Sequence, residues 1–241
     1  MNNLEKFNIE VCNLDAAGII SWALKTFGEK RIALASSFSA EDQVLTNLLL
    51  HENPHTRIFT LDTGRHFQET YDVWQKSVEF WNFSFETASA DPVELSKLLD
   101  NGGPNLFYKN IESRKACCSV RKTNPLKKIL STVDAWIVGL RSEQAVTRTG
   151  LSPVEWDQQH NIYRISPLYN WIEIDVFRYS KENALPLSEL YLKGFRSIGC
   201  APCSRSVAPF DDIRAGRWWW EEPQHKECGL HNRPKPSPQS T

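Results

Sequence analysis

The chain has 241 residues, 41% of them hydrophobic, and its 28 lysines and arginines nearly balance its 29 aspartates and glutamates. A chain of this size and composition can bury a core without disulfide staples, and its near-neutral charge argues against a polyanionic partner such as nucleic acid. The N-terminal residues lack the basic and apolar regions of a signal peptide, and no run approaches the roughly 18 apolar residues of a membrane span. We therefore expect a cytoplasmic protein with no membrane partner.

Predicted strands and helices alternate from residue 31 onwards. The apolar run Arg31–Ser36 predicts a strand, which a polar turn separates from a helix at Gln43–Leu50. A second strand is predicted at Arg57–Leu61, followed by a turn and an amphipathic helix at His66–Phe80.

Further elements continue this alternation. We expect a third strand at Asn82–Glu86 and a helix that begins after Asp91, which is suited to cap it, with Pro92 as its first residue. The run Asp134–Leu140 predicts a buried strand.

Beyond about residue 150 the pattern loosens into an apolar run at Ile162–Leu168 and a helical pattern at Ile174–Asn183. The proline-rich, polar end Arg233–Thr241 predicts a mobile C-terminal segment. Strands that alternate with helices predict an α/β fold with a parallel sheet flanked by helices. Ligands then bind at the carboxyl ends of the strands, so the turns that follow them are candidate sites.

Two polar turns follow predicted strands. In the turn Ser36–Asp42, small residues would let N–H groups and hydroxyls face an anion at a helix start, although most serine-rich turns only cap helices. The turn Leu61–Phe67 is equally compatible with an Asp-Gly turn and with a nucleotide contact. Two such turns favour a shared ligand cleft, while the lack of a Walker motif argues against a Walker-type site.

The six cysteines are clustered in a way that indicates metal binding or thiol chemistry in a reducing compartment. Cys117 and Cys118 are adjacent, and Cys200 and Cys203 have the C-x-x-C spacing. Together they make a four-thiolate set that fits zinc and an iron–sulfur cluster alike, and a lone C-x-x-C would also fit a redox disulfide. Cys12 stands alone and is assigned no role.

Cations accompany these motifs. Lys122 follows Cys118 by one helical turn, where its charge would favour a thiolate and receive an anion. Arginines at loop positions suit bidentate phosphate or sulfate contacts, although each could be an ordinary surface residue: Arg141, Arg148, Arg214 and Arg217. The three tryptophans that follow are expected to pack as a cover.

Cys228 precedes the loose end of the chain and is followed three residues later by His231. A lone cysteine beside a histidine, on a segment able to move, has the ingredients of an activated nucleophile.

The motifs CC-x-x-R-K, G-C-x-x-C and E-C-G-L-H, together with LDTGRHF and SSFSAED, resemble those of the assimilatory adenylylsulfate reductases in the phosphoadenylylsulfate reductase family. The resemblance runs from about Ala33 to His231 and implies an adenine nucleotide alpha hydrolase-like fold. It implies a nucleotide- and cluster-binding domain at residues 1–210 and a C-terminal segment at 211–241 that carries the catalytic cysteine.

The resemblance also implies roles for individual residues. Cys228 matches the nucleophile, with His231 beside the substrate, and the two cysteine pairs match the ligands of one [4Fe–4S] cluster: Cys117, Cys118, Cys200 and Cys203. The matching cations that hold the phosphosulfate are Lys122, Arg214 and Arg217. The nucleotide loops match at Ser36, Ser37, Leu61, Asp62, Thr63 and Gly64. Ser39 departs from the pattern, where a glycine is usual, and would be strained if its φ had to be positive.

The activity that the resemblance implies is reduction of adenosine 5'-phosphosulfate to sulfite and AMP, in sulfate assimilation. A thiosulfonate would form on Cys228, and thioredoxin or glutaredoxin would release sulfite from it. The alternatives are a 3'-phosphoadenosine 5'-phosphosulfate reductase, a zinc-bound ATP-pyrophosphatase-like enzyme that modifies tRNA, and a nonenzymatic metal-binding module. The oligomeric state stays open, and a homo-oligomer is compatible with the sequence.

Overall fold

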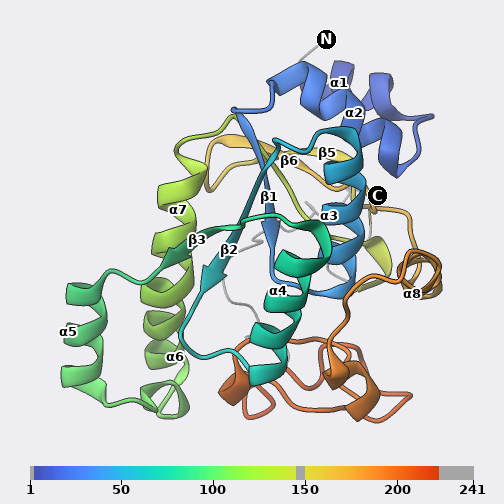
Figure 1. The fold of residues 1–241 in the computed structure, drawn as a ribbon. Helices are drawn as coiled ribbons and strands as arrows, with labels where there is room; N and C mark the ends of the chain where they lie inside the picture. The colour runs from blue at the N-terminus through green and yellow to red at the C-terminus, as the bar shows by residue number, and fades with distance from the viewer. Residues whose placement is uncertain (1–2, 145–149, 223–241) are drawn as a thin grey trace, which may run out of the picture.

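The computed structural model describes residues 3–144 and 150–222, which form a twisted sheet with helices on both of its faces (Figure 1). The six strands lie in the order β3-β2-β1-β4-β6-β5, and only β5 is antiparallel to its neighbour. Their bounds are β1 Ile32–Ser36, β2 Arg57–Asp62, β3 Glu86–Ser89, β4 Ala135–Ile137, β5 Val154–Asp157 and β6 Ile162–Ile165. The strand order reverses between β1 and β4, so a ligand crevice is expected at their carboxyl ends.

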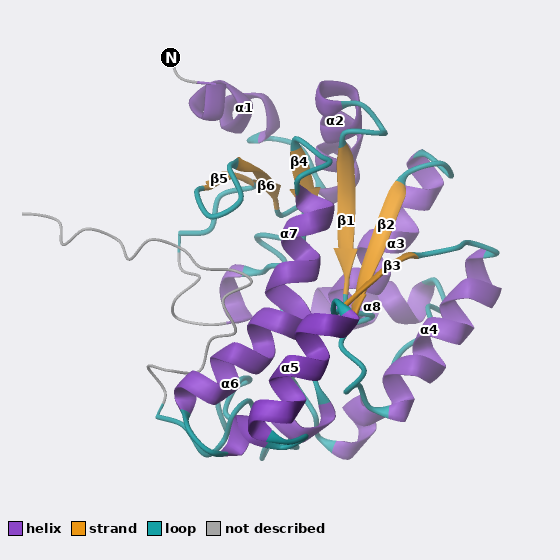
Figure 2. Ribbon diagram, turned by 90° about the vertical axis from the view of Figure 1, so that its left-hand side faces the viewer, coloured by secondary structure: helices purple, strands orange, loops and turns teal. Residues whose placement is uncertain are grey.

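Most of the helices pack against the two faces of the sheet. Their bounds are α1 Asn3–Val11, α2 Ala16–Phe27, α3 Ala40–Glu52, α4 Gln68–Trp81, α5 Pro92–Gly102, α6 Ile111–Cys118, α7 Asn124–Leu130 and α8 Glu173–Glu182. A π-helical turn at Ser119–Thr123 joins α6 to α7. Helices α5 and α6 pack side by side beyond the carboxyl ends of the strands (Figure 2). Within the described ranges, no helix has the length and apolarity that crossing a membrane requires.

Alternate residues of the central strands face two separate cores. Ile32 and Leu34 of β1 point into the core shared with α2, α3, α4 and α8, whereas Ala33 points into the core shared with α7. This arrangement follows from the two-residue period of a strand that is buried on both faces. It explains why the central strands are continuous apolar runs in the sequence.

Most predicted elements are confirmed with small shifts of their ends. The Asp91 carboxylate accepts hydrogen bonds from the backbone N–H groups of Val93 and Glu94, as expected of the N-cap of α5. The predicted strand at Asn82–Glu86 is wrong, because Asn82 has a φ of 47° and ends α4, and β3 begins at Glu86. In the segment between Asn82 and Glu86, Phe83 and Phe85 pack against the core instead.

Two further expectations about the sheet need correction. The sheet is not wholly parallel, since β5 pairs antiparallel with β6, and the sequence analysis did not predict β5. The strand expected over Asp134–Leu140 is restricted to Ala135–Ile137. The expected mobile end, Arg233–Thr241, lies outside the described residues.

Helix α3 lies between the sheet and α8, so its side chains should carry much of the stability. Leu45 of this helix is fully buried, and replacing it by alanine should lower the free energy of unfolding by about 2–5 kcal/mol through the cavity left behind. Leu192, which is 90% exposed, provides the matched control, and its alanine variant should unfold like the parent. Equal denaturant midpoints for the two variants would contradict this view of the core.

Candidate active site

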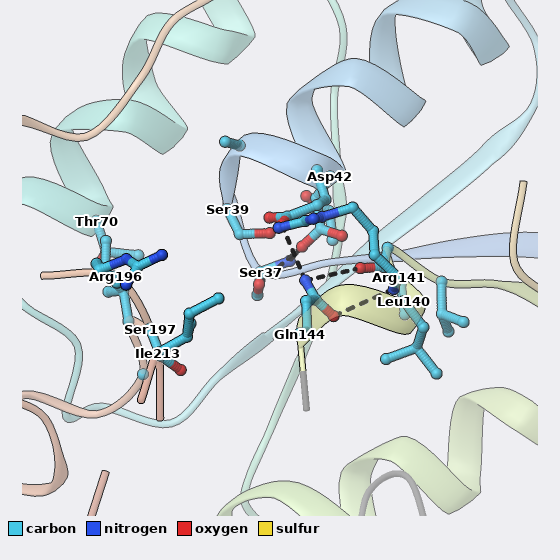
Figure 3. Close-up of a pocket in the computed structure, with 18 of the residues that line it drawn as sticks. Ser37, Ser39, Asp42, Thr70, Leu140, Arg141, Gln144, Arg196, Ser197 and Ile213 are labelled. Atoms are coloured by element: carbon cyan, nitrogen blue, oxygen red, sulfur yellow. Dashed lines mark hydrogen bonds and ion pairs between the residues drawn. The ribbon is translucent and has the colours of Figure 1, made fainter. Parts of the chain in front are cut away.

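A cavity of about 240 Å³ opens at the carboxyl ends of β1, β2 and β4, where the strand order reverses. Figure 3 shows the residues that follow β1 and β4 facing Arg196, Ser197 and Ile213 across this cavity. Seven of the residues that the sequence assigned to substrate binding line this cavity: Ser36, Ser37, Leu61, Lys122, Arg141, Arg214 and Arg217. The fold therefore brings together the two predicted polar turns, the lysine that follows the first cysteine pair, and three of the predicted loop arginines.

The loop after β1 is held by hydrogen bonds of its own. The Asp42 carboxylate accepts from both the backbone N–H and the hydroxyl of Ser37, each at 2.7 Å. The Phe38 N–H donates to the Ser36 hydroxyl at 3.2 Å, and the Ala40 N–H donates to the Tyr191 hydroxyl at 2.9 Å. Three backbone donors of this turn are thus engaged within the protein, which favours the capping interpretation over an anion site at these N–H groups.

The expectation about Ser39 is corrected by the backbone. Ser39 has a φ of -70° and is unstrained, whereas its neighbour Phe38 has a φ of 59°. The Phe38 ring is buried and stacks on Trp74 with the ring centroids 5.4 Å apart. Packing of an aromatic ring therefore supports a backbone conformation that is uncommon for a residue with a side chain.

Asp42 is a buried carboxyl group at the cavity wall, 5% exposed. Burial raises its pKa to about 6, although the two hydrogen bonds from Ser37 and its contact with Ser39 lower it. The negative charge of Glu41, the preceding residue, also raises this pKa. The first turn of α3 thus presents two acidic groups to the cavity.

Arg141 differs from the loop arginine that the sequence suggested, because it is buried and paired. Its Nε donates to Glu41 at 2.9 Å and its Nη1 donates to Glu143 at 2.8 Å. The Gln144 amide also donates to Glu41, at 2.8 Å. Figure 3 shows Arg141 and Gln144 beside Asp42 on one side of the cavity. This arginine holds the Glu41 carboxylate after β1 and the Glu143 carboxylate after β4 in place.

Only part of the predicted nucleotide turn at the end of β2 lines the cavity. Leu61 lines it, whereas Asp62, Thr63 and Gly64 are not among its lining residues. Asp62 accepts hydrogen bonds from the Gly64 N–H and the Tyr71 hydroxyl, each at 2.8 Å. Gly64 has a φ of 63°, a conformation that glycine adopts readily. These residues shape the turn and leave Thr63 facing the cysteines.

Thr63 and its neighbours join the two halves of the cysteine motif. The Thr63 hydroxyl is hydrogen-bonded to the Cys200 thiol at 3.4 Å, and the Thr63 carbonyl accepts from Arg121 at 2.6 Å. The Ala201 N–H donates to the Arg65 carbonyl at 2.7 Å. The turn after β2 therefore positions the C-x-x-C segment against the helix that carries the first cysteine pair.

The four paired cysteines are neighbours in space. Cys117, Cys200 and Cys203 pack together around the buried rings of Phe107 and Trp218, and Cys118 acts electrostatically on Cys203. Across the ranges 3–144 and 150–222, histidine, cysteine, aspartate and glutamate side chains form no group of three or more that could hold a metal ion. The structure thus brings the thiols into one region without a closed ligand set.

The thiols differ in their electrostatic surroundings. Burial raises the pKa of Cys203 to about 12 and also raises that of Cys117. Burial acts on Cys200 in the same direction, but the charges of Lys122 and Arg217 and the hydrogen bond to Thr63 outweigh it and lower the pKa of Cys200. Two cations that line the cavity therefore also act on a thiol behind its wall.

Arg217 is fixed in this position by close packing. A Cβ atom at Gly199 would lie 2.3 Å from one guanidinium nitrogen of Arg217, so a side chain at residue 199 would force the guanidinium to shift. The Arg217 guanidinium also lies 4.7 Å from the centroid of the Trp218 ring, which is almost fully buried. The tryptophan cover expected from the sequence is thus present at Trp218.

Several lining residues were not assigned from the sequence, among them Tyr191 and Arg196. Arg196 donates to the Glu173 carboxylate at 2.8 Å and lies across the cavity from Asp42 in Figure 3. Neither residue belongs to a recognisable motif, and only the fold brings them to the site. Arg148, Cys228 and His231, assigned from the sequence, lie outside the described residues.

Comparison with known proteins relates this arrangement to one enzyme family. Residues 31–206 match the model of the phosphoadenosine phosphosulfate reductase domain. The chain is 42% identical to the adenosine 5'-phosphosulfate reductase of Allochromatium vinosum over 84% of this chain and 79% of that protein. It is 43% identical to the Neisseria meningitidis serogroup A protein of the same name over 82% and 81% of the two chains.

Solved structures agree with the sequence comparisons. Phosphoadenylyl-sulfate reductase from Candida auris, solved as a phosphate complex, superposes with a TM-score of 0.73 at 25% identity and covers 85% of this chain and 96% of its own. FMN adenylyltransferase from Candida glabrata shares the fold alone, with a TM-score of 0.55 at 14% identity over 92% and 77% of the two chains.

The family model spans the whole sheet and both cysteine pairs, and the bacterial relatives match along most of their own length. The chain belongs to the phosphoadenosine phosphosulfate reductase family.

Proposed function

We propose that this protein reduces adenosine 5'-phosphosulfate to sulfite and AMP in the cavity at the carboxyl ends of β1, β2 and β4. The observation that carries the proposal is the position of Lys122 and Arg217, which line the cavity and also lower the pKa of Cys200. An anion in the cavity and the thiols behind it would share the same two cations. The bacterial relatives named adenosine 5'-phosphosulfate reductase support this substrate.

The chemistry begins with the thiolate of Cys228, on the segment 211–241 that follows the reductase domain 1–210. The thiolate attacks the sulfur of the phosphosulfate, the sulfur–oxygen bond to phosphate breaks, and AMP leaves with the electron pair. A thiosulfonate then remains on Cys228. Lys122, Arg214 and Arg217 would stabilise the charge that develops on the leaving phosphate, with His231 beside the substrate.

A reduced thioredoxin or glutaredoxin completes the cycle. One of its thiolates attacks the sulfur of Cys228 and displaces sulfite, and its second thiol resolves the mixed disulfide. The dithiol supplies both electrons and Cys228 returns to its reduced form. We assign the reaction to sulfate assimilation in the cytoplasm, where such dithiols are kept reduced.

The chemistry of the donor set suits an iron–sulfur cluster, because two segments supply four thiols, of which Cys117, Cys200 and Cys203 pack around buried aromatic rings. We propose that one [4Fe–4S] cluster is held by Cys117, Cys118, Cys200 and Cys203. When bound, the cluster would supply charge beside the substrate site. Thr63 would keep Cys200 oriented through their hydrogen bond.

Replacing Cys228 by serine should abolish sulfite formation, because serine cannot form the thiosulfonate. The parent protein, incubated with adenosine 5'-phosphosulfate and no dithiol, should gain one sulfite group on the peptide that contains Cys228, measured by mass spectrometry. The exposed Cys12 provides the control, and its serine variant should form the adduct normally. An adduct mapped to Cys12 or to the paired cysteines would contradict the mechanism.

Replacing Cys200 by serine should remove iron and activity together, because a four-thiolate site loses one ligand. Iron, zinc and acid-labile sulfide should be measured in protein prepared without oxygen, with the Cys12→Ser variant as control. Parent protein that contains stoichiometric zinc and neither iron nor sulfide would overturn the cluster assignment.

Replacing Lys122 by alanine should lower kcat/KM roughly 10- to 100-fold, since a charge-assisted contact contributes about 1.5–3 kcal/mol. Lys193 is the matched control, because it makes an ion pair with Glu69 on the surface. Its alanine variant should keep the parent kcat/KM. An unchanged kcat/KM in the Lys122→Ala variant would show that this cation does not serve the substrate.

A further inference from the structure

The described part of the chain ends beside the cavity wall. Trp218 lines the cavity and is almost fully buried. The Trp218 N–H donates to the Cys203 carbonyl at 3.2 Å, and the Trp218 carbonyl accepts from the Glu221 N–H at 2.8 Å. Two backbone hydrogen bonds therefore lead from the C-x-x-C segment to Glu221.

A buried ion pair fixes the Glu221 side chain. The Nε and Nη2 atoms of Arg114 donate to its two carboxylate oxygens at 2.8 and 2.7 Å, and the two side chains are 0% and 3% exposed. Two parallel hydrogen bonds between a planar guanidinium and a carboxylate set the direction of the contact as well as its length. Breaking the pair would leave two buried charges unpaired, so Glu221 is held firmly.

Arg114 connects this ion pair to the cavity and to the first cysteine pair. Its guanidinium lies 4.8 Å from the centroid of the Trp218 ring, and the Arg217 guanidinium lies 4.7 Å from the same centroid. The Arg114 side chain also interacts with Cys118 at the end of α6. Glu221 is therefore attached, through one arginine, to both the cavity wall and the helix that carries the first cysteine pair.

Glu221 stands close to Cys228 in the sequence. Glu222, the next residue, is exposed and is the last that the structure describes. Cys228 follows Glu221 by seven positions, so an extended chain can carry it at most about 25 Å from the ion pair. A short tether that starts beside the cavity raises the effective concentration of a nucleophile there.

We propose that Arg114 and Glu221 are positioning residues for the reaction, because their ion pair fixes the start of the segment that brings the Cys228 thiolate to the phosphosulfate. The inference rests on the proposed function and deepens it by naming the contact that directs the nucleophile. Neither side chain is among those that line the cavity. Their contribution therefore lies in the rate of thiosulfonate formation and not in the affinity for the nucleotide.

The test measures how fast Cys228 acquires the thiosulfonate when full-length protein, prepared without oxygen, is mixed with saturating adenosine 5'-phosphosulfate and no dithiol. The Glu221→Gln variant should form the adduct roughly 10- to 100-fold more slowly than the parent, as expected for a misplaced nucleophile. Its affinity for AMP and its iron content should stay at the parent values. Glu222 is the matched control, because it is the neighbouring carboxylate and is exposed. The Glu222→Gln variant should form the adduct at the parent rate.

A second variant keeps the inference testable if Glu221→Gln folds poorly. Arg114→Lys keeps a positive charge beside Glu221, but a single ammonium cannot hold both carboxylate oxygens in one plane. Adduct formation should again be slower at an unchanged affinity for AMP. Adduct formation at the parent rate in either variant, or a loss only in proportion to lost iron, would overturn the inference and leave the reductase assignment standing. A parent protein that forms no adduct on Cys228 would overturn the proposed mechanism itself.

Discussion

The packing of Arg217 against Gly199 is the contact on which the site depends. A side chain at residue 199 would displace the Arg217 guanidinium, because a Cβ atom there would lie 2.3 Å from one of its nitrogens. The same guanidinium lies over the Trp218 ring, lines the cavity and lowers the pKa of Cys200. One close approach thus places a cation between the cavity and the thiols, and the proposed chemistry requires a cation at that position.

A buried ion pair connects this contact to the other cysteine pair. Arg114 of α6 donates to both carboxylate oxygens of Glu221, at 2.8 and 2.7 Å, and lies 4.8 Å from the centroid of the Trp218 ring. Both side chains are nearly or completely buried. Because an unpaired buried charge costs about 3–5 kcal/mol, this pair holds the segment around Trp218 against α6. Helix α6 ends at Cys117 and Cys118, so the two cysteine pairs are positioned by shared packing.

Local sequence signals predicted the features that depend on neighbouring residues. The period of apolar residues located the central strands and the main helices, and Asp91 followed by Pro92 located the start of α5. The adjacency of the two polar turns followed from the carboxyl ends of parallel strands lying at one edge of the sheet. Of the eleven residues assigned to substrate binding, seven line the cavity: Ser36, Ser37 and Leu61 belong to these turns, whereas the four cations were assigned from the cysteine and loop motifs and from the family resemblance.

Features that depend on distant partners could not be predicted. Arg141 is paired with Glu41, 100 positions earlier in the chain, and Ala40 donates to Tyr191, 151 positions later. The left-handed backbone at Phe38 depends on the burial of its ring against Trp74, and no turn motif in the sequence announces it. The sequence therefore indicated an anion-binding loop, where the structure has carboxylates and engaged donors.

The central claim is that adenosine 5'-phosphosulfate is the substrate reduced in this cavity. The most direct measurement incubates protein purified without oxygen with adenosine 5'-phosphosulfate and reduced thioredoxin and quantifies sulfite and AMP. The account predicts that both products appear in equal amounts, one of each per thioredoxin oxidised. The account would be contradicted if protein that still binds AMP oxidised no thioredoxin and released no sulfite.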